Sequence, residues 1–145
     1  MTPACSQCGA AYASPEESCA RRFEALIALD HSRQDPWGSR HGSAFAVYTL
    51  QHAKGQSRQS LERCWALLYR VWILGEPESL VTQSFRSPTA RIESSRIPPF
   101  PEVTLRRFRV TIADLGGFSP EDYAQRLEAW CRATLEAFGE PAHNA

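Results

Sequence analysis

The sequence predicts a mainly α-helical protein: one domain, residues 1–145, built as a bundle of about four to five helices with one extended or strand segment near residues 103–112. Three observations predict this class. In several stretches, apolar residues recur every three to four positions, which is the spacing of one helix face. Turn-forming Pro and Gly residues separate these stretches. Hydrophobic residues make up 43% of the 145-residue chain, enough to fill the core of one such domain.

The first helix is expected to begin at Ser14, which opens the sequence Ser-Pro-Glu-Glu. Ser is a common helix N-cap, Pro is favoured at the first helical position, and a Glu three residues after the cap completes a capping box. Cys19 and Phe23 then lie on one helix face. The helix is expected to end near His31, because residues 32–39 contain an Asp-Pro pair and a Gly that mark a turn.

Three further helices follow from the same reasoning. The second is expected over about residues 40–52, where aromatic and His side chains share one stripe. The third begins at Ser57 or Ser60. It is expected to stop before Gly75, which is followed by Pro77 in the order that is usual after a helix C-terminus. A short fourth helix is expected over residues 78–85.

The second half of the chain is less regular. Residues 86–102 are rich in Ser, Arg and Pro and predict an irregular surface segment. Residues 103–112 alternate apolar and polar side chains, which predicts an extended segment that pairs with the N-terminal segment, with a partner chain, or with neither. A last helix is expected from Ser119 to about Gly139, followed by a frayed tail over residues 140–145.

Charge and hydropathy restrict the possible functions. The chain carries 16 basic and 16 acidic residues, so a large non-specific nucleic-acid footprint is not expected. No apolar run is long enough to span a bilayer, which argues against a membrane protein. The polar N-terminus has no signal-peptide pattern, and we therefore expect the protein in the cytoplasm.

A metal motif lies in residues 1–13, where Cys5 and Cys8 are separated by two residues and followed by Gly9. Two thiolates at this spacing can chelate one tetrahedral ion, and Gly leaves room for backbone N–H groups near the sulfurs. A redox dithiol uses the same spacing, but it normally belongs to a βαβ pattern, which this sequence lacks. The motif therefore predicts a zinc knuckle.

Helix geometry supplies the remaining ligands. If the first two helices form an antiparallel hairpin that turns near residue 36, residues equidistant from the turn face each other, and Cys19 lies near His52. Cys8 is only eleven residues before Cys19, so the knuckle can fold back onto the same end of the hairpin. The sequence thus predicts a Zn²⁺ site whose ligands are Cys5, Cys8, Cys19 and His52.

His41 is expected at the other end of the hairpin. Eleven residues of helix span about 16 Å between His41 and His52, far more than the roughly 4 Å between ligand atoms on one zinc. The hairpin instead places His41 beside Asp30 and His31. A hydrogen-bonded pair at the helix ends is the favoured interpretation, and these three residues are weak catalytic candidates.

The remaining cysteines, Cys64 and Cys131, each lie beside a Trp on an apolar helix face. Buried Cys behaves as a small hydrophobic residue, so both are expected in the core.

These motifs resemble a bacterial family of uncharacterised proteins, a domain-of-unknown-function family with a CxxCG…C…H…QH pattern. The matching residues are Cys5, Cys8, Gly9, Cys19, Phe23, Leu26, Ala28, Leu29, Asp30, Asp35, Pro36, His41, Tyr48, Leu50, Gln51 and His52. The resemblance implies zinc and brings no established activity. The chain departs from the pattern at Ala53, where the family has Pro, and at Gly42, where a second His is common; the latter argues against a second metal site.

The sequence favours a non-catalytic, zinc-stabilised binding or adaptor module with a protein partner, because four protein ligands leave no open coordination position. One alternative is a metalloenzyme that uses His41, Asp30 and His31, with Trp37 and Arg40 binding an anionic substrate. Another is a redox-sensitive regulator whose Cys oxidation ejects zinc. Nucleic-acid contact through Arg-rich residues 86–109 is the weakest alternative.

Overall fold

The computed structural model describes residues 3–86, 97–101 and 107–139, and this part of the chain is helical without strands. This confirms the predicted mainly α class. The helices are α1 (Cys19–His31), η1 (Gly38–Arg40), α2 (His41–Gln51), α3 (Arg58–Trp72), α4 (Glu78–Arg86), η2 (Ile112–Leu115) and α5 (Tyr123–Gly139), where η denotes a short 3-10 helix.

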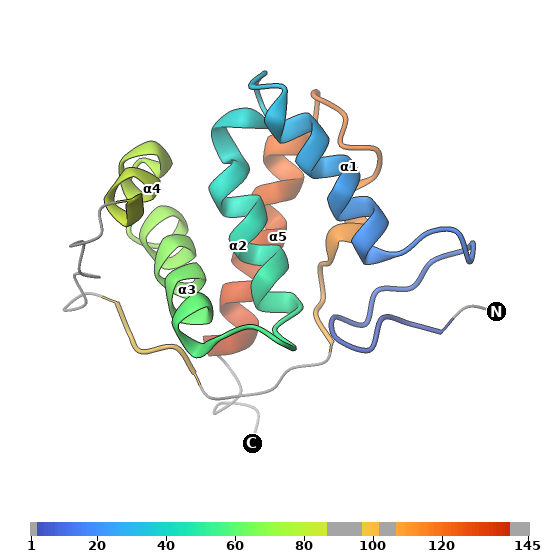
Figure 1. The fold of residues 1–145 in the computed structure, drawn as a ribbon, viewed down its shortest axis with the longest axis horizontal. Helices are drawn as coiled ribbons and strands as arrows, with labels where there is room; N and C mark the ends of the chain where they lie inside the picture. The colour runs from blue at the N-terminus through green and yellow to red at the C-terminus, as the bar shows by residue number, and fades with distance from the viewer. Residues whose placement is uncertain (1–2, 87–96, 102–106, 140–145) are drawn as a thin grey trace.

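Helix α2 lies at the centre of the fold. It contacts α1, α3, α4 and α5, and Figure 1 shows it beside α5, with α3 and α4 on one flank and α1 on the other. Seven of its eleven residues are buried, including Ala44, Val47 and Leu50. The largest fully buried side chains come from α2 and from several elements around it, and include Trp130, Tyr123, Leu26, Leu50, Leu68 and Ile112. Burial of most of α2 against these neighbours therefore holds the bundle together.

The predicted start of α1 at Ser14 is wrong by several residues. Helix α1 begins at Cys19, and its N-cap is Ser18, whose side chain accepts a hydrogen bond from Arg21 N at 3.1 Å. The Ser14 hydroxyl instead bonds to the side chain of Glu16. The same Ser14 Oγ accepts from Glu16 N at 3.3 Å, and Glu17 N donates to Ser14 O at 3.1 Å, so the Ser-Pro-Glu sequence closes a local turn upstream of the helix.

The last helix repeats this difference. The Ser119 hydroxyl bonds to Glu121, and α5 begins only at Tyr123. By contrast, Ser57 is the N-cap of α3, as one of the two predicted alternatives had it, and accepts from Ser60 N at 3.1 Å.

The predicted extended segment is not a strand where the structure describes it. In residues 107–112 no ladder forms, and η2 begins at Ile112. Phe108 N donates to Cys8 O at 3.0 Å, and Val110 O accepts from the Gln51 side chain at 2.8 Å. The apolar alternation is satisfied because Phe108, Val110 and Ile112 pack on the core, while backbone groups find partners outside any sheet.

Other predicted segments fall largely outside the described residues. Of the predicted irregular segment 86–102, the structure describes Arg86, which ends α4, and residues 97–101. In the latter, Ile97 is buried and Pro98 O accepts from Trp65 Nε1 at 2.9 Å. The predicted tail, 140–145, lies outside. Among the described residues, none of the helices is both long enough and apolar enough for a membrane span.

Candidate metal centre

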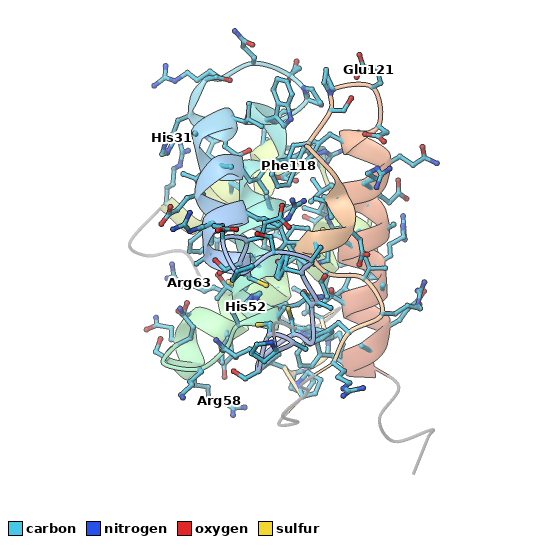
Figure 2. All side chains as sticks on the ribbon, turned by 90° about the vertical axis from the view of Figure 1, so that its right-hand side faces the viewer. His31, His52, Arg58, Arg63, Phe118 and Glu121 are labelled. Atoms are coloured by element: carbon cyan, nitrogen blue, oxygen red, sulfur yellow. The ribbon has the colours of Figure 1, made fainter. Side chains whose placement is uncertain are left out.

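Four side chains predicted as metal ligands lie together at one end of the α1–α2 hairpin. One ligand atom from each of Cys5, Cys8, Cys19 and His52 lies within 4.8 Å of the other three. They come from the N-terminal segment, the first residue of α1 and the C-cap of α2. In Figure 2, His52 lies beside the sulfur atoms of this cluster. Three separate segments thus converge on one group, of which Cys8, Cys19 and His52 are buried.

The N-terminal loop brings its two Cys residues together by backbone hydrogen bonds. Gly9 N donates to Cys5 O at 2.9 Å, and Cys5 N donates to Ala10 O at 2.8 Å. Gly9 has a φ of 85°, a left-handed conformation that costs Gly little and other residues more. The loop is fixed to the end of α2 because Lys54 N donates to Gln7 Oε1 at 3.0 Å.

Cys19 is the most densely contacted of the three sulfurs. Its Sγ lies 3.6 Å from Cys8 Sγ and accepts a hydrogen bond from Tyr12 OH at 3.0 Å. Cys19 and Cys8 are both buried, and all five cysteines are free thiols. Tyr12 is a second neighbour of the site that sequence reasoning missed, because it lies in a non-helical segment with no periodic pattern.

His52 is oriented by its own helix. Its Nδ1 donates to Tyr48 O at 2.9 Å, and its ring stacks on Tyr48 with a centroid separation of 4.1 Å. Tyr48 in turn stacks on Phe23 of α1 at 3.9 Å. The bond at Nδ1 leaves the lone pair on Nε2, which is buried and has no hydrogen-bond partner among the described residues. A carbonyl bond at one imidazole nitrogen is the usual way proteins orient a metal-binding His.

The pKa values of Cys19 and Cys8 are shifted in opposite directions. A hydrogen bond from Cys8, helped by Tyr12 and His52, lowers the pKa of Cys19 to about 4 despite its burial. The same bond, together with burial, raises the pKa of Cys8. Burial alone would lower the pKa of His52, but the neighbouring Cys19 sulfur and the Tyr48 carbonyl outweigh it and raise that pKa. The cluster therefore already stabilises a thiolate at Cys19.

This donor set has the chemistry of a closed metal site. Three sulfurs and one imidazole nitrogen suit a soft or borderline cation, and four protein donors complete a tetrahedral shell. The orphaned, buried Nε2 of His52 fits such a site, because a coordinate bond would satisfy it. Cys64 and Cys131 are buried in the core and lie outside this group, as predicted.

Comparison with known proteins agrees with the motif. Residues 3–139 match the model of a family described as a family of unknown function, DUF5946. The chain belongs to this family. No curated protein and no solved structure matches the chain.

The opposite end of the hairpin in this DUF5946 member holds the other predicted residues. His41 Nδ1 lies 2.9 Å from Asp30 Oδ2, and the His31 ring lies 5.9 Å from the His41 ring. The Asp30 side chain is fully buried, and this burial raises its pKa although the bond to His41 opposes the shift. The helix-end pair is therefore present as predicted.

Trp37 and Arg40, named in the metalloenzyme alternative, both have partners within the protein. Trp37 Nε1 donates to Phe118 O at 2.9 Å. Arg40 lies over the Trp72 ring at 4.9 Å and pairs with Glu78 at 3.3 Å. Both side chains thus have protein partners that hold the hairpin end together, and substrate binding by them, which belonged to the metalloenzyme alternative, stays a prediction.

Glu78 is a buried residue whose role the sequence did not reveal. Its carboxylate accepts from Ser43 N at 3.0 Å and also bonds to the Ser43 hydroxyl, so it caps the N-terminal turn of α2 from α4. Gly42 permits this approach, because a Cβ there would lie 2.7 Å from Thr82 Cγ2. The departure from the family pattern at Gly42 therefore has a packing reason.

We predict that His41→Ala lowers the free energy of unfolding by about 1–3 kcal/mol, because it removes the hydrogen-bond partner of the buried Asp30 carboxylate. Chemical denaturation monitored by circular dichroism measures this change. His31→Ala is the matched control, since His31 is exposed and its side chain makes no hydrogen bond among the described residues. Equal losses in the two variants would contradict a structural role for the His41–Asp30 bond.

Proposed function

We propose that Cys5, Cys8, Cys19 and His52 bind one structural Zn²⁺ ion, and that the protein is a non-catalytic, zinc-stabilised binding module. The observation that carries this proposal is the convergence of four soft or borderline donors, within 4.8 Å of one another, from three separate segments. Zinc is the metal most often held by Cys₃His sets in structural sites.

A closed ligand set supports a structural rather than a catalytic ion. Catalytic zinc normally has three protein ligands and one open position for water or substrate. Here four protein side chains supply the whole tetrahedral shell, and three of them are buried. The ion would therefore have no position at which to activate water.

The N-terminal segment explains what such an ion would stabilise. Residues 3–18 form no helix, and polar contacts such as Lys54 N to Gln7 and Phe108 N to Cys8 O fix them to the bundle. Each such bond contributes about 1 kcal/mol. A zinc ion bonded to this segment, α1 and α2 would contribute far more, because binding free energy at a structural site is also folding free energy.

A stable module of this kind is suited to present a surface to a protein partner, and we expect that partner in the cytoplasm. Five free cysteines suit a reducing compartment, where thiols are kept available for metals.

We predict about one zinc per chain in protein purified without chelators. Substitution of each ligand, by Ser at Cys5, Cys8 and Cys19 and by Ala at His52, should lower zinc content measured by inductively coupled plasma mass spectrometry. Cys64→Ala and Cys131→Ala are matched controls, because both thiols are buried but lie outside the cluster. Zinc-free wild-type protein, or zinc loss in either control, would refute the assignment.

Removal of the metal by a strong chelator should lower the melting temperature and speed amide exchange in residues 3–18, because the ion joins this segment to the bundle. Hydrogen-exchange mass spectrometry measures the second effect, with the buried face of α5 as an internal control. Exchange that stays unchanged in residues 3–18 after complete zinc removal would show that the ion does not hold the segment.

A further inference from the structure

A second concave site lies at the end of the α1–α2 hairpin opposite the metal cluster. It is a pocket of about 630 Å³, lined by residues that include Asp30, His31, Arg33, His41, Glu78 and Arg86. Pockets of about 300–1,000 Å³ accommodate small organic molecules. Figure 2 shows His31 at this end, well separated from His52.

The two carboxylates of the pocket are buried and bonded to protein groups. The Glu78 side chain is only 5% exposed, and it pairs with Arg40 and caps α2 through Ser43. The Asp30 side chain is fully buried, with Oδ2 bonded to His41 and Oδ1 without a hydrogen-bond partner among the described residues, so its charge is shielded from the pocket by burial. Neither carboxylate is free to attract a cationic ligand.

The basic groups of the pocket are free, in contrast. Arg33, Arg86 and His31 are exposed, and their side chains form no hydrogen bond or ion pair among the described residues. His41 is 44% exposed at its side chain and uses Nδ1 for Asp30, which leaves Nε2 for a ligand. The accessible charge of the pocket is therefore positive, although the whole chain has a formal net charge of zero.

We propose that this pocket binds the phosphate group of a small organic phosphate ester. Guanidinium groups match phosphate in charge and in hydrogen-bond geometry, and two of them balance a phosphate dianion. Arg33 and Arg86 contact the phosphate oxygens, His31 is an additional donor beside them, and His41 also lines the pocket. The volume exceeds what one phosphate fills and leaves space for its organic group. No ligand of the metal cluster lines the pocket, so this inference is independent of zinc.

Titration of the full chain, as purified and in phosphate-free buffer at low salt, tests the proposal. The probe is phenyl phosphate, followed by isothermal titration calorimetry. We expect saturable binding of one molecule per chain. Arg33→Gln and Arg86→Gln should each weaken it about tenfold or more, since each removes a charged hydrogen-bond donor. Arg21→Gln is the matched control, because Arg21 is exposed on α1 outside the pocket, and it should leave the affinity unchanged.

Each contrary result overturns the proposal. Absence of saturable phenyl phosphate binding would exclude the site. If Arg21→Gln weakened phenyl phosphate binding as much as the pocket variants do, the binding would be a non-specific effect of positive charge. Benzoate binding as tightly as phenyl phosphate would assign the pocket to carboxylates. Inorganic phosphate binding tighter than phenyl phosphate would exclude the organic group. Melting curves establish that the variants are folded, which we expect because the side chains of Arg33 and Arg86 are exposed.

Discussion

The register of α1 against α2 is the constraint on which both ends of the molecule depend. The Phe23 and Tyr48 rings stack between the two helices at 3.9 Å, almost parallel, and fix how far one helix is shifted along the other. This register places Cys19 near His52 at one end and Asp30 beside His41 at the other. A shift of one helical turn, about 5.4 Å, would break the cluster and the helix-end pair together.

At both ends of the hairpin, a backbone group at a terminus of α2 hydrogen-bonds to a side chain, but the side chain has a different role at each end. At the metal end, the C-terminus of α2 supplies its own carbonyl, Tyr48 O, to orient His52. At the other end, α2 lacks a side-chain cap from its own N-cap residue, Arg40, and Glu78 from α4 satisfies its first turn instead. Both devices depend on a helix terminus with unpaired backbone groups. The central position of α2 lets it organise both sites.

Apolar periodicity was sufficient to predict that the helices exist and, through the hairpin, that Cys19 meets His52, while Cys5 and Cys8 were recognised from their two-residue spacing. The hydrogen-bond partner that each polar group takes was not predictable in the same way. The hydroxyls of Ser14 and Ser119 bond to nearby carboxylates within local turns, and both helices begin downstream of these turns. In residues 107–112 the Gln51 side chain bonds to Val110 O, so no strand partner is needed there. The capping role of Glu78 depends on a contact across 35 residues that no local pattern reveals.

Zinc K-edge X-ray absorption spectroscopy of the purified protein tests the central claim most directly, because it reports the ligand atoms around the ion itself. A Cys₃His site predicts three sulfur scatterers at about 2.3 Å and one nitrogen at about 2.0 Å. A shell composed of oxygen and nitrogen alone, or one with two sulfurs or fewer, would contradict the site built from Cys5, Cys8, Cys19 and His52.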